Sequence, residues 1–387
     1  MRIAIGVPGR FHALDLAEAL AARRHAVTLL TDDPVWRFQR PGTGSVRTLS
    51  FWGHGLVARL ADRVGRKNLP AGMVLREAAA FGGWVARRLN QAEWEVGHLW
   101  SGIALETLQR PGRRGRVLLM RGSAHIRAQE ALLQAEARRA GVRIERPGEG
   151  MVRREEEEYR LSDRICVLSS FARDTFLERG VDPAKLRLLP LGADTSVFRL
   201  SSEELEARRR RILAGAPLEV LFVGNLSLQK GMWDMAQIIR GCGPDRFRFR
   251  LVGARLPESR RCLGMVAGQW RWIPPQRGAA LREQYVGADL FLFPTIQDGF
   301  GLVLAQARAA ALPILATVHC AGPDLVESGR TGWTFPIRTP DRFIEQLHWC
   351  DRNREALAGM VEASAETNRQ RDWAEVAADF EAICRAG

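Results

Sequence analysis

Short apolar runs alternate with amphipathic helical patterns along most of the chain. The runs hold three to five residues rich in Val, Ile, Leu and Phe, which is typical of strands buried on both faces of a parallel sheet. The predicted strands are residues 3–7, 26–30, 117–120, 165–168, 186–190, 219–223, 249–252, 289–293 and 314–316. Helical periodicity predicts helices at residues 14–22, 127–140, 171–179, 281–286, 302–311, 342–349, 356–365 and 373–385, and one that begins at Trp233. This alternation indicates an α/β fold with doubly wound parallel sheets.

The alternation runs twice, on either side of a charged segment. A chain of 387 residues is longer than one hydrophobic core usually supports. We therefore predict an N-terminal Rossmann-like domain at residues 1–198, a linker at 199–217 and a C-terminal Rossmann-like domain at 218–365. A last helix within residues 366–387 is expected to pack back toward the N-terminal domain.

The clearest candidate site follows the predicted strand at residues 289–293. A Gly-Phe-Gly turn comes next and opens a helix of small apolar residues, and in a parallel unit such a loop faces the ligand crevice. The backbone N–H groups of Phe300, Gly301 and Leu302 are unpaired at the helix start and suit an anionic or hydroxyl-rich ligand. Asp298 directly precedes the turn. The alternative is a core helix after a glycine turn.

Two loops of the first half carry candidate polar groups. Gly9 and His12 follow the first strand, and Arg121 and His125 follow the strand at residues 117–120. The loops after parallel strands lie at the crevice edge of an open sheet. The alternative for His125 is a solvated or capping histidine. The G-x-G-x-x-G fingerprint is absent from the first loop, which argues against an NAD-dependent enzyme.

The second half begins with a strand that runs into a glycine loop. Gly224 and Asn225 follow the strand, and Lys230 lies just before the next helix. A glycine turn with a lysine at a helix start can cradle phosphate groups. The loop is not a P-loop, because G-x-x-x-x-G-K-[ST] is missing.

Charge is unevenly distributed in the first half. Residues 51–90 interleave Trp and Phe with arginines, so this stretch either contacts an anionic membrane peripherally or forms surface helices with one face on the sheet. The acidic run at residues 155–158 is interpreted as a solvated helix face.

Composition narrows the classes of partner. The chain has 57 Lys and Arg against 44 Asp and Glu, which gives a net charge of +13. Such a charge would attract nucleic acid, anionic lipid or a phosphorylated substrate. The alternative is that a coding bias toward arginine produces the excess. No nucleic-acid-binding module is recognisable, so no nucleic acid partner is expected. The six cysteines show no C-x-x-C pair, which indicates free thiols and no zinc site. With no signal peptide or membrane span recognised, we expect a cytoplasmic protein, with peripheral contact at the inner face of the membrane as a further expectation.

Several motifs in order resemble one enzyme family. The run DGFGLVLAQARAAALP resembles the E-x-F-G-x-x-x-x-E-A-x-A-x-G-x-P element of the retaining family 4 glycosyltransferases (glycosyl transferases group 1). VGNLSLQKG is similar to the family's VGRLxxxKG loop, and DRICVLSSFARDTFLERGVDPAKLRLLPLGADTSVF to its segment near the hinge. The resemblance covers nearly the whole chain and is weakest between Trp36 and Gly112. It implies the GT-B fold, in which two Rossmann-like domains face a central cleft.

The resemblance implies a donor site in the C-terminal domain. Lys230 would bind the diphosphate of a nucleotide-sugar. Asp298 stands where the family has a first Glu that touches the donor sugar, and Gln306 where a second Glu receives the ribose hydroxyls. The remaining donor-binding residues would be Gly9, Gly224, Asn225, Gly299, Phe300, Gly301 and Leu302.

The resemblance also implies an acceptor side in the N-terminal domain. His125 matches a family histidine close to the transferred sugar and joins Asp298 and Lys230 as the predicted catalytic residues. His12 would face phosphate and acceptor, and Arg121 could meet an anionic sugar or acceptor phosphate. The resemblance implies no metal or cofactor, and a UDP- or GDP-linked sugar would serve as co-substrate.

Three departures from the family pattern affect the donor site. Asn225 replaces the usual arginine and removes a positive charge, whereas Gln306 replaces a carboxylate and removes a negative one. Asp298 is one methylene shorter than Glu. Since the two charge changes offset each other, we expect a working site whose choice of donor and rate differ from those of the family.

We therefore predict a metal-independent retaining glycosyltransferase that moves a sugar from a nucleotide-diphosphate sugar to a glycan, lipid-linked or small-molecule acceptor. A GT-B nucleotide-sugar epimerase is one alternative. A degenerate GT-B protein that binds nucleotide or glycan without turnover is another, prompted by Asn225 and Gln306.

Overall fold

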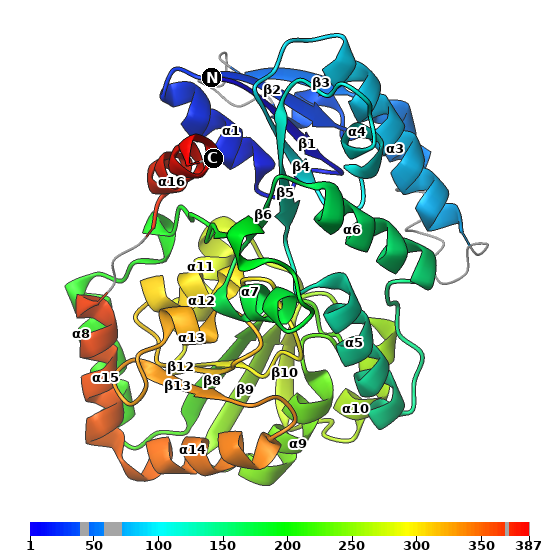
Figure 1. The fold of residues 1–387 in the computed structure, drawn as a ribbon. Coiled ribbons are helices and arrows are strands. Elements are labelled where there is room, and N and C mark those ends of the chain that lie inside the picture. The colour runs from blue at the N-terminus through cyan, green and yellow to red at the C-terminus, as the bar shows by residue number, and fades with distance from the viewer. Residues whose placement is uncertain (39–45, 58–71, 368–370, 387) are drawn as a thin grey trace.

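The protein folds into two α/β domains, each built on a parallel sheet (Figure 1). The structure is a computed structural model that describes residues 1–38, 46–57, 72–367 and 371–386. Every strand pair in both sheets is parallel, which confirms the predicted architecture of two Rossmann-like domains.

The first domain contains a sheet with strand order β3-β2-β1-β4-β5-β6-β7 among the described residues. Its strands are β1 (Arg2–Val7), β2 (Ala26–Thr31), β3 (Val46–Ser50), β4 (Val96–Trp100), β5 (Arg116–Arg121), β6 (Arg164–Val167) and β7 (Leu186–Leu188). Its helical elements are α1 (Ala13–Ala22), η1 (Val35–Phe38), α3 (Met73–Asn90), α4 (Leu105–Leu108), α5 (Ile126–Ala140), α6 (Glu149–Leu161), α7 (Ser170–Leu177), η3 (Pro183–Lys185) and η4 (Ser196–Phe198). The strand order reverses between β1 and β4, which places a crevice at the carboxyl ends of these strands.

The second domain has strand order β10-β9-β8-β11-β12-β13 among the described residues. Its strands are β8 (Leu218–Val223), β9 (Phe247–Val252), β10 (Trp270–Ile273), β11 (Leu290–Phe293), β12 (Ile314–Thr317) and β13 (Gly332–Phe335). Its helical elements are α8 (Ser202–Leu213), α9 (Met232–Cys242), η5 (Pro257–Ser259), α10 (Arg260–Gly264), α11 (Gly278–Val286), α12 (Leu302–Ala309), α13 (Gly322–Leu325), α14 (Pro340–Arg352) and α15 (Arg354–Glu366). Here the order reverses between β8 and β11.

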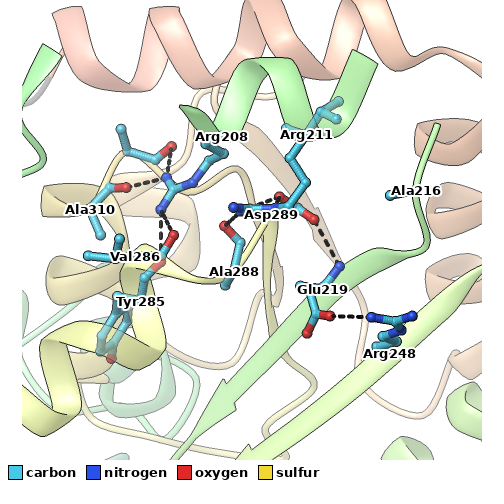
Figure 2. A network of polar contacts seen from close by, with 12 residues as sticks. Arg208, Arg211, Ala216, Glu219, Arg248, Tyr285, Val286, Ala288, Asp289 and Ala310 are labelled. Carbon is cyan, nitrogen blue, oxygen red and sulfur yellow. Dashed lines mark hydrogen bonds and ion pairs between the residues drawn. The ribbon is translucent and has the colours of Figure 1, made fainter. Parts of the chain in front are cut away.

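The helix α8 lies in the segment that the sequence predicts to be a linker, and its Ile212 belongs to the core of the second domain. Figure 2 shows that Arg208 and Arg211 of this helix reach the segments around Tyr285, Asp289 and Ala310. Arg208 is fully buried, and its guanidinium donates hydrogen bonds to the carbonyl oxygens of Tyr285 (2.8 Å) and Ala311 (3.1 Å). Burial lowers the pKa of Arg208 to about 9. One turn on, Arg211 pairs with Asp289 at 2.7 Å, so two of the four successive arginines at residues 208–211 anchor α8 to the segments that precede β11 and β12.

The last helix, α16 (Trp373–Arg385), lies against α1 of the first domain (Figure 1). Phe380 and Cys384 belong to the core of the first domain. Glu381 accepts hydrogen bonds from Arg23 and His25, each at 2.7 Å. The bond from Arg23 and, to a smaller extent, the bond from His25 lower the pKa of Glu381 to about 2.

The acidic run differs from the prediction of a solvated face. Glu155 and Glu158 are buried, whereas Glu156 and Glu157 pair with arginines at the surface. Glu158 accepts hydrogen bonds from three backbone N–H groups of residues 102–105, at 2.6–3.0 Å. Burial and the neighbouring Glu155 raise the pKa of Glu158 to about 8. The prediction is wrong for these two carboxylates, because positions three apart on a helix share one face, here the inner one.

The basic stretch at residues 51–90 is described in part. Within α3, Phe81, Trp84, Val85 and Leu89 are buried, so this helix packs one face on the domain, as one of the two interpretations predicts. Residues 58–71, with four of the basic side chains of the stretch, lie outside the described residues. No helix among the described residues is long and apolar enough to cross a bilayer.

Candidate functional site

Three loops from the two domains meet at the carboxyl ends of the sheets. They follow β5 (residues 121–125), β8 (224–231) and β11 (294–301), and they carry most of the predicted site residues. Since β8 and β11 flank the reversal of strand order in the second sheet, two of these loops lie at its ligand crevice.

The loop after β8 is fixed against the loop after β11 by a glycine turn. Gly231 has φ +78°, and a Cβ at this position would come within 1.8 Å of the Pro294 carbonyl oxygen. The carbonyl oxygen of Gln229 accepts hydrogen bonds from the Ile296 N–H (2.9 Å) and from the Thr295 hydroxyl (3.1 Å). Only glycine allows this close approach, and the approach determines where the preceding residue, Lys230, lies.

Lys230 and Asp298 form an ion pair between these loops. Both side chains are partly accessible, with exposed fractions of 20% and 22%. Asp298 also accepts a hydrogen bond from the N–H of Phe300 at 3.3 Å, so its carboxylate joins the lysine to the start of α12. The Lys230 ammonium lies 5.7 Å from the centre of the Phe293 ring.

The start of α12 presents backbone N–H groups at this site. Gly301 adopts φ +82° and directly precedes Leu302, the first residue of the helix. Phe300 is buried and contributes to the core of the first domain, although it belongs to the second. Gln306, further along α12, accepts a hydrogen bond from the Tyr285 hydroxyl at 2.9 Å, which leaves its amide N–H groups as donors.

The loops of the two domains touch directly. The hydroxyl of Ser123 donates to the side-chain oxygen of Gln297 at 2.7 Å. A Cβ on Gly299 would lie 2.1 Å from the Gly122 carbonyl oxygen. The predicted donor residue Gly299 therefore lies at the contact between the domains, where a larger side chain cannot fit.

His125 is buried rather than exposed at the crevice. It is the N-cap of α5, and its Nδ1 accepts a hydrogen bond from the Arg127 N–H at 3.2 Å. Its ring lies between those of Tyr159 and Phe176, each 4.9 Å away. Burial, followed by nearby arginines, lowers the pKa of His125 to about 4 and keeps the imidazole neutral at pH 7.

Arg121 is also committed to internal contacts. Its guanidinium is 3.1 Å from the Glu155 carboxylate and donates to the Ala124 carbonyl oxygen at 2.9 Å and to the Gln129 side chain at 2.5 Å. The structure thus places Arg121 where it orders the loop after β5. An anionic sugar would reach its charge only by displacing these partners.

The loop after β1 lies beside a cavity in the first domain. The Gly9 N–H donates to Asp32 at 2.6 Å, and the other Asp32 oxygen lies 3.2 Å from Nδ1 of His54. Nε2 of His54 lies 3.0 Å from the Glu77 carbonyl oxygen, so both ring nitrogens face acceptors. The Asp32 bond raises the pKa of His54, and the geometry favours the doubly protonated ring.

This cavity has a volume of about 540 Å³ and opens at the carboxyl edge of the first sheet. Its lining includes Gly9, Asp32, His54, Phe81 and Glu155. Large apolar side chains are exposed on the segments that follow β1, β2 and β3, and each of these segments contributes lining residues, namely Phe11, Arg37 and His54. The exposed apolar side chains, which we call the apolar rim, are Phe11, Trp36, Trp52, Leu56 and Val57.

His12 does not line the cavity. Its ring lies 5.2 Å from that of Trp100 and stacks 5.9 Å from that of Trp373 on α16. Burial lowers the pKa of His12 to about 4. The predicted acceptor-side histidine is thus held between a strand end and the C-terminal helix.

Sequence reasoning missed several residues of this region. His54 lies in the part of the chain where the motifs are weakest, and Asp32, two residues after a predicted strand, belongs to no motif. Gln297 is one residue from a predicted site residue and gave no pattern of its own. No group of three or more His, Cys, Asp or Glu side chains that could hold a metal ion occurs in the described part of the chain.

Two family models match successive parts of the chain. The model described as Glycosyltransferase Family 4 matches residues 10–197, and the one described as Glycosyl transferases group 1 matches residues 217–352. The D-inositol 3-phosphate glycosyltransferase of Actinosynnema mirum is 33% identical over 200 residues, which cover 46% of this chain and 47% of that protein. The chain thus spans about half the length of the curated relatives it matches.

Solved structures resemble the whole chain. Sucrose-phosphate synthase from Thermosynechococcus elongatus superposes with a TM-score of 0.73 at 18% identity, covering 100% of this chain and 98% of that one. Anabaena HepE in complex with UDP and glucose gives a TM-score of 0.69 at 12% identity, with 100% of both chains covered. At such identities the likeness shows the fold alone.

Proposed function

Because the chain belongs to the family 4 glycosyltransferases and has their GT-B fold, we propose that it transfers a sugar from a nucleotide-diphosphate sugar with retention of anomeric configuration and without a metal ion. One observation carries the donor assignment. Lys230, Asp298 and the N–H groups that begin α12 converge where the strand order of the second sheet reverses. This arrangement suits a diphosphate ester and its sugar.

We propose that this site promotes the reaction by stabilising the negative charge that develops on the leaving group. The bond between the sugar C1 and the diphosphate oxygen breaks, and the departing diphosphate gains negative charge. The Lys230 ammonium and the helix N–H groups stabilise that charge as it develops. The acceptor oxygen bonds to C1 on the same face, and its proton passes to an oxygen of the departing diphosphate.

Lys230 and Asp298 would exchange partners during this reaction. In the present structure their opposite charges satisfy each other. A bound diphosphate competes for the ammonium, which leaves the Asp298 carboxylate to accept hydrogen bonds from hydroxyl groups of the donor sugar. The nucleotide proposed is a uridine diphosphate, supported by the complex of the fold neighbour HepE with UDP and glucose.

The acceptor proposed is a saccharide carried on a lipid at a membrane surface. The cavity of about 540 Å³ in the first domain is large enough for a sugar, and the apolar rim belongs to the same segments as its lining residues Phe11, Arg37 and His54. Exposed tryptophans beside a basic stretch favour the interface of an anionic bilayer.

The membrane contact is tested by sedimentation with phosphatidylglycerol vesicles at low salt. The double variant Trp36→Ser/Trp52→Ser should lose binding, whereas Met265→Ser, which removes an exposed apolar side chain from the second domain, should keep it. A wild-type protein that stays in the supernatant refutes this part of the proposal.

The donor is tested first by thermal shift with UDP, GDP, ADP and their common sugars, with and without EDTA. A ligand that binds the native state raises the melting temperature by mass action. We expect an EDTA-insensitive shift with UDP that is lost in Lys230→Ala. Binding without hydrolysis or transfer to any acceptor would instead support a protein that binds nucleotide without turnover.

A further inference from the structure

A cationic side chain outside the predicted site lies beside the loop after β8, which carries Asn225 and Lys230. Arg255 follows β9, and its backbone forms an isolated parallel bridge with Leu226. The Leu226 N–H donates to Ala254 at 2.8 Å, and its carbonyl oxygen accepts from the Leu256 N–H at 3.1 Å. This segment therefore runs alongside the loop after β8, next to Asn225.

Two tryptophans hold the guanidinium of Arg255. It lies 4.3 Å from the centre of the Trp272 ring and 5.0 Å from that of Trp270. The Trp272 indole donates to the Gly253 carbonyl oxygen at 2.9 Å, which fixes that ring against the loop. Aromatic rings orient a guanidinium without neutralising its charge.

The charge of Arg255 has no acidic partner among the residues that the structure describes. The donor site itself is short of positive charge. Lys230 is paired with Asp298, and Asn225 is neutral and exposed where the family has an arginine. A diphosphate therefore gains from a second fixed cation.

The direction of a bound nucleotide also favours Arg255. In the second sheet β9 pairs with β8, and β10 pairs with β9. A nucleotide that extends from the loop after β8 on the side away from β11 therefore runs toward the carboxyl ends of β9 and β10. Arg255 and Trp272 lie at those ends.

We propose that Arg255 binds the donor, with its guanidinium on a phosphate of the nucleotide, in place of the arginine that Asn225 replaces. This inference rests on the proposed function. Trp270 and Trp272 act as positioning residues that hold the guanidinium ready. The site selects a nucleoside di- or monophosphate over the free nucleoside.

The test is calorimetric titration of wild type and Arg255→Ala with UDP, UMP and uridine, with the guanosine and adenosine series run in parallel. We expect a UDP affinity about tenfold or more weaker in the variant, a smaller loss for UMP and none for uridine. High salt should reduce the difference. Arg255→Lys should recover part of the affinity, and Asn225→Arg added to Arg255→Ala should recover more.

The matched control is Arg248→Ala, which removes another exposed arginine from β9 at the amino end of the strand. It should leave all affinities unchanged. An unchanged UDP affinity in Arg255→Ala overturns the inference, and so does an equal loss for uridine, which would place the guanidinium on the base. A wild-type protein that binds none of the nucleoside diphosphates overturns the proposed function as well.

Discussion

The two domains differ in how exposed the polar side chains are in the loops that follow their strands. In the second domain, Lys230 and Asp298 stay partly exposed, and glycine turns place backbone N–H groups beside them. In the first domain, His125 and Arg121 are 3% and 8% exposed and are occupied by internal partners. A polar residue after a strand is therefore a weaker guide to a site than a glycine turn that exposes backbone N–H groups.

The difference has a physical origin in what lies behind each loop. Gly231 and Gly301 adopt positive φ and turn the chain, and Lys230 before the first turn and Leu302 after the second stay partly exposed. Behind the loop after β5, by contrast, Tyr159 and Glu155 fill the space and bind its polar groups. On the proposed function, the second domain would supply the charged groups for the reaction, whereas the first would supply buried packing and a cavity.

The largest effect should come from Lys230→Ala, which removes the ammonium at the proposed diphosphate site. We expect kcat to fall by about 10²- to 10³-fold, as when one preorganised charge partner is lost. Initial rates of sugar transfer measure it. Lys185→Ala is the control, because that ammonium donates to the Arg160 carbonyl oxygen away from the site. Equal losses in both variants would contradict the contrast between the domains.

Gly299→Ala breaks the contact between the loops. The added Cβ would lie 2.1 Å from the Gly122 carbonyl oxygen, so the loops must separate. A displacement of about 1 Å at an active site can cost about 100-fold in rate, and we expect a loss approaching that in kcat/KM. Gly264→Ala, at a position with no atom within 4 Å of the new Cβ, should be neutral.

Buried histidines in the first domain should make the free energy of unfolding depend on pH. Burial lowers the pKa of His98 to about 3 and that of His125 to about 4. In the unfolded chain these imidazoles take up a proton near pH 6.5. Between pH 6.5 and 4 the unfolded state therefore binds more protons, and the free energy of unfolding falls as the pH falls.

For each of these histidines, the free energy of unfolding should fall by about 1.4 kcal/mol per pH unit as the pH drops from 6.5 to 4. Above pH 6.5 the histidines should cause no change. Urea unfolding at several pH values measures the slope. His98→Asn and His125→Asn should each reduce it, whatever their effect at pH 7. An unchanged slope would mean that the imidazoles are accessible, as the groups of the second domain are.

The smallest effect is expected for Tyr285→Phe. The change removes the hydroxyl that donates to Gln306 and should cost about 1 kcal/mol of unfolding free energy. Nucleotide affinity should shift only a few-fold, since Gln306 is free to rotate but keeps its donors. Thermal unfolding and UDP titration together measure the two effects, and a loss of all binding would show that the Gln306 rotamer is critical.

The sequence predicted the fold largely because the central strands are continuously apolar. Four strands escaped prediction, and each carries polar or small residues: β3 contains Arg47 and Thr48, β4 contains Gly97 and His98, β10 contains Arg271, and β13 begins with Gly332. Such strands lie at the edges of a sheet or are stabilised by partners that periodicity does not reveal.

The candidate site was predictable where it depends on local backbone geometry. The turn around Gly301 and the position of Lys230 follow from motif spacing, and the structure joins them through Asp298. The burial of His125 and the contact of Gln297 with Ser123 depend on residues far apart in the chain. No pattern in one segment carries that information.

The helix α16 places the two ends of the described chain on the same domain (Figure 1). The first domain is therefore assembled from segments separated by the whole of the second. During synthesis its core lacks Phe380 and Cys384 until the last helix emerges, whereas the second domain is continuous from α8 to α15. The second domain can complete its core first, and a nascent chain that stops before residue 373 leaves an apolar face of α1 uncovered for chaperones to bind.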